Sequence, residues 1–249
     1  MKVRTSTIGC FLNMTSYIKE LRVSDDCVYI VDRSSRLGAG SYGEVYLGTR
    51  KSDGIKIAAK QSRSGDKESW RSEVKNLLHV QHEHVVTALN FKMEHASWWL
   101  FMEYCDGGDL NKFCERSYPD RKGQLTIMYQ CTSALNYMHN EVDPPLVHRD
   151  IKPNNILMMT RGHEVIAKIA DFGLAKIFDC NGEGSTHLFT TNCGTDTFKA
   201  PELFASASDS WTRAVDVFSF GLVFFSLTQQ RQPPRVPLYP LEGAHSLLC

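Results

Sequence analysis

The chain has 249 residues, of which 42% are hydrophobic and 22% charged, as is usual for a soluble globular protein long enough to bury a sizeable core. Lysine plus arginine and aspartate plus glutamate both number 28, so a formal charge of zero gives no reason to expect nucleic acid or an anionic membrane as a partner. No run approaches the roughly eighteen apolar residues of a membrane span.

The ends and the cysteines give weaker indications. The apolar stretch at 8–12 is too short and too polar for a signal peptide, so we expect 1–29 to be a short leader. The eight cysteines show no CxxC pair and no regular framework. Free thiols in a reducing compartment are the simpler explanation, which favours an intracellular protein, cytoplasmic or nuclear or both.

The first patterned segment is rich in glycine. Gly38, Gly40 and Gly43 have GxGxxG spacing, and the residues from Val45 to Thr49 alternate and are β-branched or aromatic. Dinucleotide-binding units share the spacing, but their glycines lead from a strand into a helix. A strand follows here, so we predict a strand–turn–strand flap whose backbone amides can approach phosphate oxygens, because glycine lacks a Cβ.

The next elements are a strand, a helix and a second strand. The apolar segment Ile55 to Ala59, broken by Lys56, predicts a strand that ends at Lys60, where a lysine is usually solvated. A helical apolar stripe follows at Trp70, Val74, Leu77 and Leu78. Residues 98–105 are typical of a buried strand, and the glycine pair at 107–108 then marks a boundary between a β-rich part and a helical part.

A long helix is predicted from Gln124 to Glu141. Its apolar periodicity is consistent with burial, and Pro144-Pro145 would end it. The positions that carry this pattern are Leu125, Met128, Tyr129, Ser133, Leu135, Tyr137 and Met138.

The most informative segment runs from His148 to Asn155 and is followed, sixteen residues after Asn155, by Asp171-Phe172-Gly173. Transfer of a phosphoryl group needs a carboxylate that orients a hydroxyl and accepts its proton, and oxygen ligands that hold Mg²⁺ against the phosphates. Asp150 suits the first role. Asn155 and Asp171 suit the second, because hard Mg²⁺ prefers carboxylate and amide oxygens.

Ala200-Pro201-Glu202 closes the segment that Asp171 opens. In order, spacing and identity, these motifs resemble those of a eukaryotic protein kinase over roughly residues 30 to 228. The resemblance implies an α+β, two-lobed protein-kinase-like fold with a β-rich small lobe at 30–103 and a mainly helical large lobe at 104–228. It also implies ATP and Mg²⁺ as cofactors and a protein as substrate.

The resemblance assigns roles around the nucleotide. Lys60 would contact the α- and β-phosphates and pair with Glu73 rather than with its competitor Glu68, since the family's helix is followed at nine residues by a histidine, here His82. The remaining adenine-site positions are Met102 as gatekeeper, the backbones of Glu103 and Cys105 at the adenine edge, and Val45, Ala58 and Leu157 around the ring. The last three would serve equally as ordinary core residues.

Lys152, two residues after Asp150, follows the pattern of serine/threonine-directed members and would neutralise charge on the transferring phosphoryl group. Arg149 implies regulation, because in the family this arginine docks a phosphate of the activation segment. Thr191 matches the usual phosphorylated position, so an upstream activating kinase is a possible partner, and Thr195 matches a residue that bonds the catalytic Asp and Lys.

The chain departs from the family near its end. A helix from about Val215 to Leu227 is apolar almost all round and is expected to be buried on every side. Family members continue well beyond this point, so we expect an incomplete large lobe. The tail at 229–249 has four prolines between 233 and 240, which forbid a helix. It is either a solvated, disordered end or a proline-rich ligand for an SH3-type partner.

Three functional hypotheses remain. The first is an ATP- and Mg²⁺-dependent serine/threonine protein kinase, since Lys60, Asp150 and Asp171 are all present. The second is a nucleotide-binding pseudokinase or scaffold module that cannot hold a substrate. The third is a fragment whose large lobe does not fold.

Overall fold

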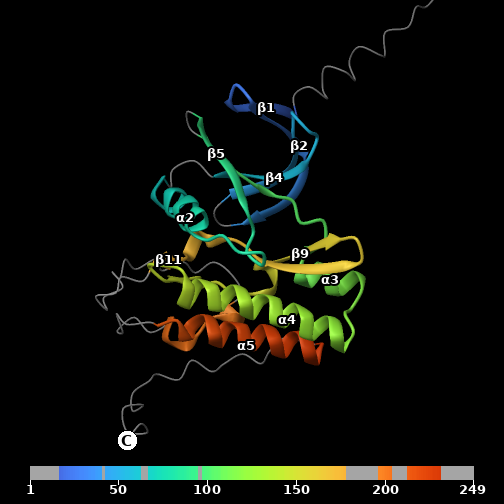
Figure 1. Cartoon of the computed structure of the whole chain (residues 1–249), viewed down its shortest axis with the longest axis vertical. Helices are drawn as coiled ribbons and strands as arrows, with labels where there is room; N and C mark the ends of the chain where they lie inside the picture. The colour runs from blue at the N-terminus through green and yellow to red at the C-terminus, as the bar shows by residue number, and fades with distance from the viewer. Residues whose placement is uncertain are drawn as a thin grey trace, which may run out of the picture.

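The computed structural model describes residues 17–40, 43–62, 67–94, 97–177, 196–203 and 212–230. A curled antiparallel sheet forms the upper part of the molecule in Figure 1, and helices α4 and α5 lie side by side in the lower part. The strands of the sheet, in the order β1-β2-β3-β4-β6-β5, are β1 (Ile18–Ser24), β2 (Cys27–Gly40), β3 (Gly43–Arg50), β4 (Lys56–Ser62), β6 (Ser97–Glu103) and β5 (Ala88–Glu94).

The sheet curls until its two edge strands meet. Lys19 Nζ of β1 lies 2.5 Å from Glu94 Oε2 of β5, and Lys92 Nζ of β5 donates to the Arg22 carbonyl of β1. The curl encloses a core in which Leu21, Tyr29, Trp99 and Phe101 are almost fully buried, with the rings of Tyr29 and Phe101 stacked at 4.1 Å. Strand β1 is therefore part of the small lobe.

The predicted leader at 1–29 was wrong from residue 18 onward. β1 pairs with β2 along its length, and β2 itself begins at Cys27 rather than at 30. The sequence pattern was weak because only Leu21 of the seven residues in β1 is buried. An edge strand that inserts a single side chain into the core shows little hydrophobic alternation.

Leu21→Ala should lower the free energy of unfolding by about 2 to 5 kcal/mol, because it leaves a cavity in a closed core. Urea unfolding followed by tryptophan fluorescence would measure the loss. Val23→Ala in the same strand removes a partly buried side chain and should cost much less. Equal and small losses for the two variants would mean that β1 does not contribute to the folded core.

Helix α2 (Lys67–His79) packs against the outer face of the sheet. Trp70, Val74 and Leu77 are buried, as the apolar stripe predicted, whereas Leu78 is half exposed. The same core continues downward through Leu146, Ile156 and Phe172, and reaches Val223 of α5. One hydrophobic core therefore joins the two lobes.

The large lobe contains α3 (Leu110–Arg116), α4 (Arg121–Asn136) with a π-helical end at Tyr137–Glu141, and α5 (Ala214–Gln229). Short strands lie above these helices: β7 (Gly108–Asp109), β8 (Leu146–Val147), β9 (Ile156–Arg161), β10 (Glu164–Ile169) and β11 (Lys176–Ile177). Four 3₁₀ turns complete the described part of the lobe, at Pro153–Asn155, Phe172–Leu174, Asp196–Phe198 and Pro201–Leu203.

The predicted boundary at the glycine pair has a steric reason. The Gly107 amide donates to the Met158 carbonyl at 2.8 Å, and a Cβ at Gly107 would stand 2.5 Å from that carbonyl oxygen. Gly108 has a φ of +69°, which side chains rarely adopt. Any larger residue would push the connector between the lobes away from β9.

Two helices that the sequence predicted to be buried are present at the predicted positions, but each is buried on one face only. On α4 the buried residues are Ile127, Cys131, Ala134 and Leu135, whereas Leu125 and Tyr129 are 54% and 74% exposed. On α5 the residues Val215, Val223 and Leu227 are buried, but Val217 is 62% exposed. Both helices bury the face that meets the core. None of the helices in the described residues combines the length and apolar character needed to cross a membrane.

Candidate active site

The glycine flap is formed by the ends of β2 and β3. Gly38 pairs with Val45, and Gly40 pairs with Gly43 on either side of a tip that lies outside the described residues. Gly43 has a φ of +149°, and a Cβ there would stand 2.1 Å from the Gln61 carbonyl oxygen. A strand and not a helix follows the glycines, so the dinucleotide-type interpretation is excluded for this segment.

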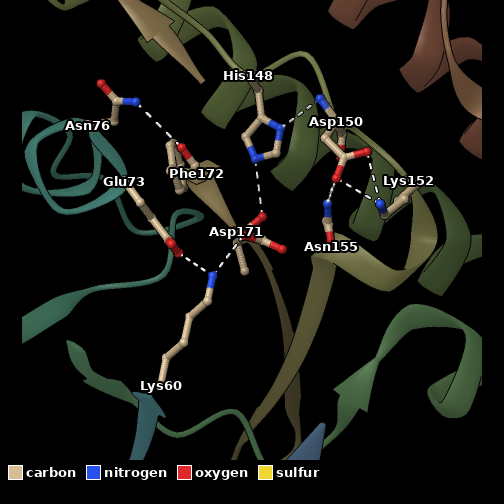
Figure 2. A network of polar contacts seen from close by, with 10 residues as sticks. Lys60, Glu73, Asn76, His148, Asp150, Lys152, Asn155, Asp171 and Phe172 are labelled. Atoms are coloured by element: carbon tan, nitrogen blue, oxygen red, sulfur yellow. Dashed lines mark hydrogen bonds and ion pairs between the residues drawn. The ribbon is translucent and has the colours of Figure 1, made fainter. Parts of the chain in front are cut away.

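A buried ion triad joins the sheet, α2 and the segment after β10. Lys60 Nζ lies 2.5 Å from Glu73 Oε1 and 3.0 Å from Asp171 Oδ1. Figure 2 shows the Lys60 ammonium directed between the two carboxylates. The competitor Glu68 lies in the first turn of α2, well before Glu73 along the helix. Of the two candidates, Glu73 is therefore the one that the fold brings to the lysine.

The pKa values of the triad are shifted by burial and by the charges within it. Burial alone would lower the pKa of Lys60, but the carboxylates of Asp171 and Glu73 outweigh burial and raise it. Burial also acts to raise the pKa of Asp171, yet the Lys60 ammonium holds it below its usual range. Burial raises the pKa of Glu73, against the opposing charge of Lys60. Lys60 is thus a permanent cation and Asp171 an anion near neutral pH.

Asp150 lies at the centre of a second group of contacts. Lys152 Nζ is 2.9 and 2.7 Å from its two carboxylate oxygens, and Asn155 Nδ2 donates to Oδ2 and to the Asp150 carbonyl, each at 2.8 Å. The 3₁₀ turn at Pro153–Asn155 makes this return possible, because it brings Asn155 back beneath Asp150. The three predicted residues Asp150, Lys152 and Asn155 therefore form one cluster (Figure 2).

His148 links the two groups. The Asp150 amide donates to His148 Nδ1 at 3.3 Å, so the ring proton lies on Nε2, which is 3.1 Å from the Ala170 carbonyl. The imidazole also meets the Phe172 ring edge-on at 4.9 Å. The segment that contains Asp150 and the segment that contains Asp171 are thereby held together through one buried side chain.

The donor chemistry of Asn155 and Asp171 fits a divalent cation. The amide nitrogen of Asn155 donates to Asp150, which leaves its Oδ1 available to a cation. Lys60 bonds Oδ1 of Asp171, which leaves Oδ2. One amide and one carboxylate oxygen are the hard ligands that Mg²⁺ accepts together with phosphate oxygens.

The predicted adenine-site residues lie around the junction of the two lobes. Ala58 of β4 pairs with Met102 of β6, and Leu157 of β9 belongs with Met102 to a small apolar cluster that also contains the buried Cys105. Burial raises the pKa of the Cys105 thiol to about 12, so it stays neutral. Val45 lies opposite Lys60 in the β3–β4 ladder.

Glu103 is held in place through both its backbone amide and its side chain. Its amide donates to the Thr87 carbonyl at 3.0 Å, so the carbonyl is the backbone group of Glu103 that remains for a ligand. Its side chain is also engaged, since Oε1 lies 2.8 Å from Lys168 Nζ. If the backbones of Glu103 and Cys105 both contact adenine, as predicted, Glu103 does so through its carbonyl group.

The sequence prediction missed two residues that support the site. Asp216 of α5 accepts the His148 amide at 2.8 Å, the Arg149 amide at 2.7 Å and His139 Nε2 at 2.8 Å. Asn76 of α2 donates to the Ala175 carbonyl at 2.8 Å, beyond Phe172. For Asp216 the sequence did offer an indication, because an aspartate inside an otherwise apolar helix is a buried charge that needs partners. Thr191 and Thr195 lie outside the described residues.

The comparisons with known proteins agree with this geometry. A model of the protein kinase domain matches residues 31–236. A putative serine/threonine-protein kinase/receptor of Acanthamoeba polyphaga mimivirus is 30% identical over 84% of this chain and 12% of its own length. A putative leucine-rich repeat receptor-like serine/threonine-protein kinase of Arabidopsis thaliana is 34% identical over 77% of this chain and 21% of its own length.

A putative serine/threonine-protein kinase of Helianthus annuus is 34% identical over 76% of this chain, and here the match covers 78% of the relative. The chain thus spans less than a quarter of the viral and Arabidopsis relatives but most of the sunflower one. The matched part includes all of the residues discussed in the two groups around Asp150 and Lys60.

Proposed function

The chain belongs to the protein kinase family, and the relatives described above are named as serine/threonine-protein kinases. We propose that it transfers the γ-phosphoryl group of Mg-ATP to serine or threonine hydroxyls of a protein substrate. The observation that supports this most is that the cluster around Asp150 and the triad around Lys60 occur together, joined by His148. Together they supply a carboxylate, two lysines and two oxygen ligands, which are kinds of group that phosphoryl transfer uses.

In the proposed reaction the substrate hydroxyl oxygen attacks the γ-phosphorus, and the bond from that phosphorus to the β,γ-bridging oxygen breaks, which leaves ADP. Asp150 orients the hydroxyl and accepts its proton. Lys152, in contact with Asp150, offsets charge on the transferring group, and Lys60 holds the α- and β-phosphates. A divalent ion at Asn155 and Asp171 would neutralise the phosphate oxygens.

We assign the nucleotide base to the lobe junction. Met102, Glu103 and Cys105 would line its edge, and Val45, Ala58 and Leu157 its faces, with Gly38, Gly40 and Gly43 above the phosphates. The support is that β3, β4, β6 and β9 bring these residues to the same junction as Lys60.

A regulatory site at Arg149 is part of the proposal. Partial burial lowers the pKa of Lys176, and the nearby Arg149 charge lowers it further. A phosphate on Thr191 would relieve the repulsion between these two cations, as expected for an upstream activating kinase. An SH3-type partner for the tail stays a prediction about residues outside the described ones.

The test is transfer of labelled phosphate from ATP to a mixed protein substrate, with analysis of the phosphorylated amino acids. We expect phosphoserine and phosphothreonine, and loss of transfer when a chelator removes divalent cations. Labelled nucleotide that binds without transfer would favour the pseudokinase or scaffold alternative. Phosphotyrosine as the main product would contradict the assignment of Lys152.

Lys60→Met should abolish stabilisation by ATP, because it removes the ammonium assigned to the phosphates. For the wild type, ATP at 100 times its Kd should add about 2.7 kcal/mol to the free energy of unfolding, seen as a higher Tm. Lys56→Met, in the same strand but exposed, is the matched control and should keep the full shift. An ATP shift retained in Lys60→Met would refute the role of Lys60 in nucleotide binding.

A further inference from the structure

Among the described residues, the proposed mechanism leaves the buried lysine Lys168 unused. Lys168 of β10 is only 4% exposed, and its Nζ lies 2.8 Å from Glu103 Oε1 and 2.7 Å from the Glu83 carbonyl. A buried ion pair costs desolvation that an apolar pair of similar size avoids, so its presence calls for a reason other than stability. Lys168 stands three residues before Asp171 and directly opposite Leu157 in the β9–β10 ladder.

The segment at 82–87 is held between the two partners of this ion pair. On the Glu103 side, the Thr87 amide donates to Glu103 Oε1 at 2.7 Å and the Glu103 amide donates to the Thr87 carbonyl at 3.0 Å. On the Lys168 side, the Val86 amide donates to the Ile169 carbonyl at 2.9 Å, and the Ile169 amide to the His84 carbonyl at 2.8 Å. Three segments distant in sequence are thus joined at one point.

This junction connects the two ends of the proposed nucleotide site. Glu103 ends β6 and belongs to the adenine edge, whereas β10 leads directly through Ala170 to Asp171 at the phosphate end. The Ala170 amide also donates to the Asn155 carbonyl at 2.9 Å, so the segment that leads from Lys168 to Asp171 is hydrogen-bonded to the other proposed cation ligand. A bound ATP molecule would have to contact both ends at once.

We propose that Lys168 is a positioning residue that fixes the adenine edge at Glu103 relative to the phosphate end at Asp171. The two ends of the site then have the arrangement that ATP needs before it binds. The inference rests on the proposed nucleotide site. Without the ion pair, ATP must order the two ends as it binds, and this cost reduces affinity. The cost is the same in the ground state and the transition state, so KM for ATP rises while kcat stays nearly unchanged.

Comparison of a ligand that reaches both ends with one that reaches a single end isolates this effect. ATP spans the adenine edge and the phosphate end, whereas adenosine lacks phosphates and depends on the adenine edge. Lys168→Met should therefore raise the Kd for ATP by about tenfold and the Kd for adenosine by less than about twofold. Lys168→Arg keeps the charge and should restore most of the ATP affinity. Lys75→Met on the exposed face of α2 should change neither.

Titration calorimetry of the whole chain measures both constants, and transfer assays give KM and kcat for ATP. Equal loss for ATP and adenosine, or no loss for either in a folded Lys168→Met, overturns the proposal. If Lys168→Met does not melt cooperatively, Glu103→Gln replaces it, because the glutamine amide can still accept from Thr87 while the charge is lost. A ratio of the ATP Kd to the adenosine Kd that is unchanged from the wild type then overturns the proposal. A wild type that binds ATP yet transfers no phosphate contradicts only the proposed catalysis, whereas one that binds neither ligand refutes both.

Discussion

Asp150→Asn should lower kcat by about 10² to 10⁴-fold, because an amide of the same size cannot accept the proton of the substrate hydroxyl. The carboxylate is held by Lys152 on both oxygens and by Asn155 on Oδ2, so its orientation is fixed before any substrate binds. ATP affinity should change little, since Asp150 contacts no group of the Lys60 triad in the described residues.

The measurement is the initial rate of phosphate transfer at saturating ATP, with the ATP-dependent rise in Tm recorded on the same samples. Asp25→Asn, at a fully exposed carboxylate in the turn between β1 and β2, is the matched control and should retain the wild-type rate. A rate for Asp150→Asn within about tenfold of the wild type would contradict proton acceptance by this residue. A lost ATP shift would instead indicate a distorted site.

The sequence was sufficient to predict which residues the fold brings together around Asp150. Those residues stand in short segments, so the spacing within Asp150 to Asn155 already implied that one turn could bring them together. The strand after the glycines was also predictable, because its alternation is strong where the flap packs on β4. Distances and protonation required the fold, whereas the resemblance already favoured Glu73 over Glu68 as the partner of Lys60.

The remaining features depend on contacts between distant segments. Helical periodicity predicted α4, yet it did not distinguish the buried Ile127 and Cys131 from the exposed Leu125 and Tyr129, because an apolar side chain does not tell which neighbour covers it. Strand β1 was missed for the opposite reason, since a single buried leucine sufficed to join it to the sheet. In each case the partner, rather than the local pattern, determined burial.

Buried charges were the least predictable. Lys168 meets a carboxylate 65 residues away, and Asp216 meets amides 67 and 68 residues away. The sequence shows only a charged residue within an apolar element, which indicates that partners exist but not which ones. In the described residues both side chains bond groups other than Asp150 and the Lys60 triad, so no motif of reacting groups includes them.

Asp216→Ala should lower the free energy of unfolding by about 3 to 5 kcal/mol, a large part of the 5 to 15 kcal/mol of a typical domain. The change removes the acceptor of three buried or partly buried donors: the His148 amide, the Arg149 amide and His139 Nε2. Arg149 also has a φ of +65°, a left-handed conformation that costs a residue with a side chain about 1 to 3 kcal/mol and persists only while its surroundings hold it. Asp150 follows directly, so transfer should fall even in the molecules that remain folded.

Urea unfolding and the transfer rate per folded molecule measure the two effects separately. Ser219→Ala, also buried on α5 but bonded only within its own helix, should cost about 1 kcal/mol and leave the rate unchanged. Asp216→Asn keeps one acceptor oxygen and should lie between these variants in stability. If Asp216→Ala unfolds like Ser219→Ala and transfers phosphate at the wild-type rate, α5 does not hold the segment from His148 to Asp150. The catalytic carboxylate would then depend on Lys152 and Asn155 alone for its position.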